Sequence, residues 1–99
     1  MPIEAVKLSG SAITTAPQAS IVPPIIGHRG AGCHAPENTL ASICRAAVLG
    51  VRWVELDARL SRDLEVILLH DDTVDRTSDG SGLVAEKDWA ELQALDAGA

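Results

Sequence analysis

The sequence contains no phenylalanine and no tyrosine, and its two tryptophans are Trp53 and Trp89. Any hydrophobic core must therefore be largely aliphatic, and the 46% hydrophobic composition is sufficient to form one. A chain of 99 residues is long enough for one small domain at most.

Cysteine is scarce as well, because the chain has only Cys33 and Cys44, which do not form a CxxC pair. Two cysteines are too few for a disulfide framework, so we expect free thiols in a reducing compartment. The neighbouring His34 makes a Cys33/His34 metal site conceivable. A loop histidine without a chemical role explains the same residues more simply.

Long apolar runs and excess positive charge are also missing. No apolar stretch approaches the ~20 residues that a membrane-spanning helix requires. Lys7 is not followed by the apolar segment of a signal peptide, so the expected location is cytoplasmic. The 14 acidic side chains outnumber the 8 basic ones, mostly within residues 51–99. This excess argues against nucleic acid or an anionic membrane as partner and is compatible with a cation site.

The first part of the chain predicts one short strand. Residues 1–20 show no clean hydrophobic period and are expected to form an irregular extension, followed by a single domain over residues 21–99. A strand is predicted over residues 25–28, because Pro23 and Pro24 disfavour an earlier start.

Two helices follow from capping and periodicity. Asn38 is the expected N-cap of a helix that runs to Leu49 and is stopped by Gly50. A second helix is predicted over residues 88–97, where Asp88 begins a capping-box-like turn. Its predicted apolar stripe consists of Trp89, Leu92 and Leu95.

The segments 51–60 and 66–70 are predicted to form an antiparallel hairpin, because about five residues are too few for a parallel crossover. A turn with an even number of residues would place Glu55, Asp57 and His70 on one face. Leucine is costly at positive φ, so Leu64 predicts a turn that is longer than, or shaped differently from, a type I′ turn. The register, and with it the exact neighbour of His70, stays open.

Three short motifs carry candidate chemistry. His28-Arg29-Gly30 follows a strand, where α/β folds place catalytic groups, and Arg29 offers donors suited to phosphate. Glu55 and Asp57 would share one strand face, and their oxygen ligands favour Mg²⁺ or Ca²⁺ over zinc. His70-Asp71 ends the next strand. Taken singly, these motifs also fit an ordinary strand-to-loop junction, a solvated strand end and a hydrogen-bonded terminal histidine.

The combination is more specific. HRG, PENT, E-x-D, HD and an RT…G-G loop follow one another between His28 and Gly82, and this run resembles the N-terminal signature of the glycerophosphodiester phosphodiesterase family. The resemblance covers roughly residues 25–98. It implies an α/β fold that is the N-terminal portion of a (β/α)₈ TIM barrel, with the site at the C-terminal face of the strands.

The resemblance also implies roles. The general acid/base pair would be His28 and His70, the ligands of Mg²⁺ or Ca²⁺ would be Glu55 and Asp57, and the phosphate-binding residue would be Arg29. Glu37 and Asn38, from the PENT motif, would shape the first loop, and Glu37 is a candidate for contact with the site. The substrate would be a glycerophosphodiester, converted through a cyclic phosphate to glycerol 3-phosphate and an alcohol.

Length is the main departure from the family. A full barrel takes ~250 residues, and the third metal carboxylate and a downstream basic residue of the family are absent here. We therefore expect little or no activity from the isolated chain, and self-association through open strand edges. The alternatives are an inactive truncated remnant, a partner-dependent fragment, or another phospholipase-C-like lipid phosphodiesterase of the sphingomyelinase-D type.

Overall fold

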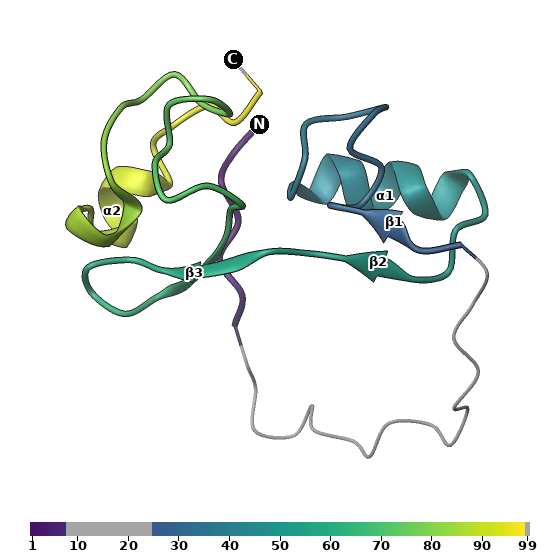
Figure 1. The fold of residues 1–99 in the computed structure, drawn as a ribbon, viewed down its shortest axis with the longest axis horizontal. Coiled ribbons are helices and arrows are strands. Elements are labelled where there is room, and N and C mark those ends of the chain that lie inside the picture. The colour runs from purple at the N-terminus through teal and green to yellow at the C-terminus, as the bar shows by residue number, and fades with distance from the viewer. Residues whose placement is uncertain (8–24, 99) are drawn as a thin grey trace.

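The computed structural model describes residues 1–7 and 25–98, which form two lobes connected through one extended segment (Figure 1). The first lobe contains β1 (Gly27–His28), α1 (Leu40–Val48) and β2 (Val54–Glu55). The second contains β3 (Ala58–Leu60), β4 (Val66–Leu68), the 3₁₀ helix η1 (Val84–Glu86) and α2 (Trp89–Leu92). The predicted α/β order is confirmed, and the strands of the described residues form no closed barrel.

In the first lobe, β1 and β2 pair in parallel, with α1 connecting them. The N-cap of α1 is Thr39, whose hydroxyl accepts a hydrogen bond from the Ser42 N–H at 3.2 Å. The prediction of Asn38 as N-cap was therefore wrong by one residue, because the Asn38 side chain bonds elsewhere. Gly50, at φ 83°, follows the last turn, as its sequence position predicted.

The buried side of α1 is made of small residues. Ser42 and Ala46 are buried, whereas Leu40 and Val48 on the same helix are exposed. This allows the loop after β1 to lie against the helix, since a Cβ on Gly30 would come within 2.3 Å of the Ser42 hydroxyl. Gly30 also has a φ of 84°, so both the close approach and the backbone conformation require glycine at this position.

In the second lobe, β3 and β4 form the predicted antiparallel hairpin. Ala58 pairs with Leu68, so even-numbered residues face even-numbered ones, and the pairing expected for a turn with an even number of residues does not occur. The cause is the turn, because three residues connect Ser61 and Glu65, whose backbones are hydrogen-bonded at 3.0 Å. Leu64 takes a φ of 65° in this turn. The turn is therefore not type I′, as expected, but leucine adopts the costly conformation all the same.

The predicted strand over residues 51–60 divides into β2 and β3, which belong to different sheets. Residues 56–57 lie between them, so one continuous segment carries the chain from the first lobe to the second. The carboxylates of Glu55 and Asp57 therefore stand at the junction of the lobes.

Residues 1–7 lie along the free edge of β4. Glu4 accepts a hydrogen bond from the Leu68 N–H at 2.9 Å, and the Val6 N–H donates to Val66 at 2.8 Å. Ile3 is 2% exposed and belongs to the core of the second lobe. Its core partners are Ile67, Leu69, Val74, Val84, Leu92 and Ala97. The rest of the predicted extension lies outside the described residues, and its boundary at residue 20 stays a prediction.

Helix α2 is shorter than the predicted span of 88–97. The Asp88 side chain forms no cap and instead accepts two hydrogen bonds from Arg62, while Asp63 accepts from the Trp89 N–H. The apolar stripe is confirmed, with Leu92 buried and two flanking residues packed on the core. None of the helices in residues 1–7 and 25–98 is long and apolar enough to cross a membrane.

Candidate functional site

The carboxyl ends of β1 and β2 bring three of the predicted residues together. His28 is the register partner of Glu55, and its Nε2 lies 3.8 Å from a Glu55 carboxylate oxygen. The same oxygen accepts a hydrogen bond from the backbone N–H of Arg29 at 3.2 Å. Parallel pairing causes this arrangement, because both strands end at the same edge of the sheet.

Asn38 holds Asp57 in place. Its amide nitrogen donates to an Asp57 carboxylate oxygen at 3.1 Å, and its amide oxygen accepts from the Asp57 N–H at 3.0 Å. Asn38 is buried and has a φ of 57°, a conformation that asparagine tolerates better than most residues. The tertiary hydrogen bonds therefore explain both the strained backbone and the lost N-cap.

Arg29 lies between two carboxylates. Its Nη1 donates to Glu37 at 3.0 Å, and its Nε is 3.5 Å from an Asp57 oxygen. That Nε is buried and makes no hydrogen bond among the described residues. Arg29 also has a φ of 56°, so its backbone is strained where its side chain enters the site. The predicted phosphate-binding guanidinium is thus fixed by Glu37 and directed toward Asp57.

The surroundings of Asp57 favour its ionised form. Burial raises the pKa of Asp57, but the hydrogen bond from Asn38 and the nearby charge of Arg29 outweigh this effect, so the net shift of the pKa is downward. Glu55 ends β2 and Asp57 follows two residues later, so both acidic side chains belong to the same short segment. The pair is therefore a concentrated oxygen-ligand set.

This set fits part of a divalent cation site. Mg²⁺ and Ca²⁺ bind carboxylate oxygens, and Asp57 is already oriented by its amide partner. Within residues 1–7 and 25–98, however, no group of three or more histidine, cysteine, aspartate or glutamate side chains is arranged to hold a metal ion. Glu55 and Asp57 can thus supply two ligands, while water or further groups must complete the coordination.

His70 stands on the second lobe, beyond β4. Its Nδ1 lies 2.8 Å from the Asp71 carboxylate, which therefore receives the Nδ1–H and leaves Nε2 free to exchange a proton. Its carbonyl accepts a hydrogen bond from the Arg59 Nε at 2.9 Å. The preceding residue, Leu69, donates its N–H to the Asp57 carbonyl at 3.0 Å, so His70 follows directly on a residue paired with Asp57 despite the altered register.

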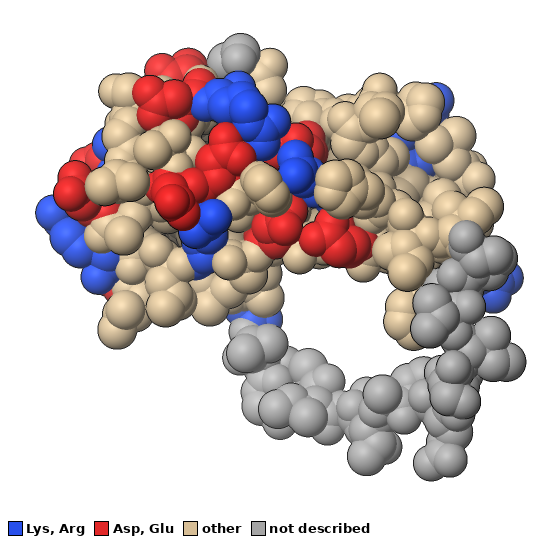
Figure 2. Space-filling model, in the orientation of Figure 1, with Lys and Arg blue, Asp and Glu red and all other residues tan. Residues whose placement is uncertain are grey.

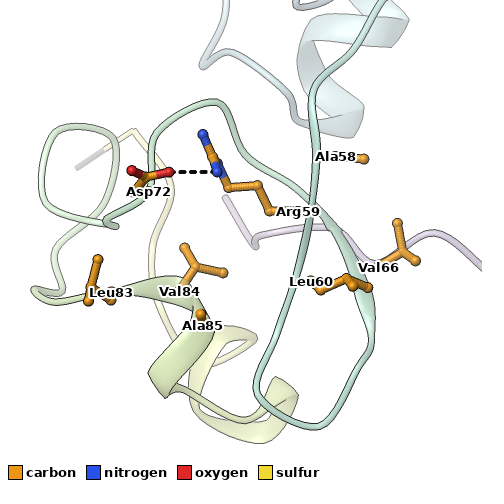
Figure 3. Close-up of a pocket in the computed structure, with 8 residues that line it drawn as sticks. All are labelled: Ala58, Arg59, Leu60, Val66, Asp72, Leu83, Val84 and Ala85. Carbon is orange, nitrogen blue, oxygen red and sulfur yellow. Dashed lines mark ion pairs between the residues drawn. The ribbon is translucent and has the colours of Figure 1, made fainter.

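Arg59, which donates to the His70 carbonyl, also lines a pocket of about 490 Å³ between the hairpin and η1 (Figure 3). Its lining is mostly aliphatic, and Arg59 and Asp72 form an ion pair of 2.7 Å at its edge. The pocket contains none of the predicted catalytic residues. Its contribution to the site is Arg59, which holds the His70 backbone.

Arg76 is a residue of this cluster that sequence reasoning missed. It donates hydrogen bonds to Asp71 and to Glu37, and so connects the second lobe to the first. Hydrogen bonds from Arg76 are the largest cause of the lowered pKa of Glu37, and they hold the pKa of Asp71 far below its ordinary range. Its place in the RT…G-G loop was the available signal, but nothing in the sequence indicated its partners.

The Gly-rich loop after β1 borders a second hollow of about 460 Å³. His28, Arg29 and Glu37 line it together with the loop glycines. Cys33 and His34 also lie on it and are exposed. Among the described residues, Cys33 and His34 belong to no metal-binding group. The residues of the hollow that belong to the candidate site are His28, Arg29 and Glu37.

Comparisons with known proteins identify the family. The family model described as "Glycerophosphoryl diester phosphodiesterase family" matches residues 28–99, which is more than half of the chain. The chain belongs to this family. A glycerophosphodiester phosphodiesterase of Caldanaerobacter subterraneus is 45% identical over 74 residues, covering 75% of this chain and 30% of the relative.

Solved structures show the same relationship for the fold. A phosphodiesterase of Oleispira antarctica, solved in complex with the product sn-glycerol-3-phosphate, is 50% identical with a TM-score of 0.75, over 77% of this chain and 31% of that one. A glycerophosphodiester phosphodiesterase of Agrobacterium tumefaciens is 44% identical with a TM-score of 0.72, over 74% and 32%. The chain thus spans about a third of these family members and corresponds to part of their barrel.

Proposed function

We propose that this chain carries the His/His and carboxylate part of a metal-assisted site for glycerophosphodiester hydrolysis. The products would be glycerol 3-phosphate and an alcohol. The observation that carries the proposal is the convergence of Glu55 and Asp57 at one junction. His28 lies 3.8 Å from Glu55, and His70 follows Leu69, whose N–H donates to the Asp57 carbonyl. The family membership and the product named for the Oleispira relative support this substrate class.

Each residue has a distinct task in this proposal. His28 and His70 exchange protons with the attacking and leaving oxygens, since imidazole titrates near neutrality. Arg29, fixed by Glu37, binds a phosphoryl oxygen. Glu55 and Asp57 would hold the divalent cation, which when bound neutralises charge on the phosphoryl group.

The isolated chain is expected to turn over slowly or not at all, because two carboxylates leave the cation with few protein ligands. Binding of the product is therefore the sharper test. Glycerol 3-phosphate should shift the NMR signals of His28, Arg29 and His70 when Mg²⁺ or Ca²⁺ is present, and chelator should abolish the shifts.

Two matched substitutions decide the role of the arginine. Arg29→Gln should weaken product binding ~10-fold or more, the scale of a lost charge-assisted hydrogen bond, whereas Arg45→Gln on the exposed side of α1 should not. Any release of glycerol 3-phosphate from glycerophosphocholine should require the cation and disappear in His70→Ala but not in His34→Ala. Binding that is unaffected by Arg29→Gln would contradict the proposal.

A further inference from the structure

Arg76 contacts carboxylates from both lobes with two edges of one guanidinium. Nε and Nη2 donate to Asp71 at 2.8 and 3.0 Å. Nη1 and Nη2 donate to Glu37 at 3.3 and 2.6 Å. Only a planar guanidinium can serve two carboxylates in this way, because the lysine ammonium is a compact point charge.

Asp71 transmits this contact to His70. One Asp71 oxygen accepts from Nδ1 of His70 at 2.8 Å and also from Arg76, while the other oxygen accepts from Arg76 alone. With both oxygens held, the carboxylate cannot rotate away from the imidazole. The ring is therefore kept as the Nδ1–H tautomer, with Nε2 unprotonated.

Glu37 extends the same chain of contacts to the first lobe. It accepts hydrogen bonds from Arg29 and Arg76, and its side chain is only 17% exposed. The orientation of His70 and the position of Arg29 thus depend on one shared arginine, although the two residues belong to different lobes.

We propose that Arg76 is a positioning residue, which fixes the tautomer and orientation of His70 through Asp71 and couples them to Arg29 through Glu37. Its purpose rests on the proposed function, in which Nε2 of His70 exchanges a proton with the substrate. Any exposed ion pair adds a little stability, so a change in unfolding would not distinguish this positioning role from that of an ordinary ion pair. The tautomer of His70 reports this role directly.

Arg62 provides a matched control. It belongs to the same lobe and forms an equivalent fork, donating to both oxygens of Asp88 at 2.9 Å. That carboxylate makes no hydrogen bond with His70 among the described residues. Substitutions of Arg62 therefore remove a similar ion pair without touching the chain of contacts from Arg76.

The experiment is ¹⁵N NMR of the histidine rings in the full chain, ~2 pH units above the ordinary imidazole pKa of ~6.5. His70→Ala assigns the His70 signals. In the wild type, His70 should be mostly the Nδ1–H tautomer. In Arg76→Lys and Arg76→Gln, the ratio of Nε2–H to Nδ1–H should rise at least ~3-fold, whereas Arg62→Lys and Arg62→Gln should leave it unchanged. A response in Arg76→Lys would assign the effect to the fork and not to the charge.

An unchanged His70 tautomer in both Arg76 variants, or a wild-type ring that is mainly Nε2–H, would overturn the proposal. If the Arg76 variants lose their dispersed amide spectrum, Asp71→Asn gives the same test, and retention of the wild-type tautomer there is the contrary result. No substrate or cation is needed. Failure of product binding would therefore refute the proposed function without affecting this result.

Discussion

Positive φ angles distinguish two kinds of strained residue in this molecule. Arg29, Asn38 and Leu64 are the non-glycine residues with positive φ in the described ranges. The first two direct their side chains toward Asp57, so the surrounding contacts sustain the strain. Leu64 is 73% exposed at the tip of a turn and makes no such contact. The same backbone conformation is thus sustained by tertiary contacts at Arg29 and Asn38 and is only costly at Leu64.

Replacing the turn leucine should therefore stabilise the chain. Leu64→Gly should raise the free energy of unfolding by about 1 kcal/mol, because glycine reaches positive φ without the Cβ clash. Urea denaturation measures the change. A variant no more stable than the wild type would show that the conformation of Leu64 carries no strain.

The opposite result is expected at Asn38, although glycine would suit its φ equally well. Asn38→Gly removes two hydrogen bonds to Asp57 and should lower the free energy of unfolding by about 2 kcal/mol. The comparison with Leu64→Gly in the same denaturation series is the control. Stability equal to the wild type would mean that the Asn38 amide does not hold Asp57.

The sequence predicted the identities of the clustered residues but not these conformations. Asn38 was assigned as an N-cap from its neighbours, because capping rules consider only local partners. Its actual partner is 19 positions away, at the lobe junction. Arg76 escaped notice for the same reason, since its contact with Glu37 spans 39 positions.

At the scale of elements, the second lobe depends on a segment with no recognisable pattern. Residues 1–7 hydrogen-bond to the edge of β4, and Ile3 fills the core beneath it. A strand edge covered in this way is protected from pairing with another chain. The short run contains too few residues for hydrophobic periodicity to predict its pairing.

Truncating the buried residue of this segment tests its contribution. Ile3→Ala should lower the free energy of unfolding by about 2–4 kcal/mol, through lost burial and the resulting cavity. Val6→Ala, at a position 37% exposed in the same segment, should cost less than about 1 kcal/mol. Equal effects in urea denaturation would contradict the docking of this segment.

The hairpin illustrates a different limit of prediction. Its existence followed from the short spacing of the two apolar segments, and the structure confirms it. Its parity depended on whether the turn held an odd or even number of residues. A single residue reverses every facing pair, so an uncertain turn could not predict the neighbours of His70.

At the scale of the whole molecule, charged and exposed apolar side chains are distributed unevenly between the two lobes. On the face drawn in Figure 2, charged side chains gather over the second lobe and the junction, whereas the part around α1 is largely uncharged. The exposed apolar residues of this first lobe are Ile25, Ile26, Leu40, Val48, Leu49 and Trp53. The self-association expected from open strand edges stays a prediction.

The junction between the lobes should be sensitive to acid. Arg76 lowers the pKa of Glu37 and Asp71, so the stability they contribute is fully present above their ordinary values near ~4. It is lost as pH falls through the lowered values of the folded state. Unfolding followed between pH ~7 and ~2 should show this decline in the wild type and a shallower one in Arg76→Gln. Identical pH profiles for the wild type and Arg76→Gln would contradict the claim that Arg76 lowers the pKa values of Glu37 and Asp71.

Cation binding is the most direct test of the claim that Glu55 and Asp57 hold a divalent cation. Mn²⁺ accepts the same oxygen ligands as Mg²⁺, and its unpaired electrons broaden the NMR signals of nearby nuclei. The broadening should centre on Glu55, Asp57 and the His28 loop, and should disappear in Asp57→Asn but persist in Asp88→Asn. Broadening that centres on the other acidic side chains of the second lobe, or that is unchanged in Asp57→Asn, would show that the carboxylate pair is not the cation site.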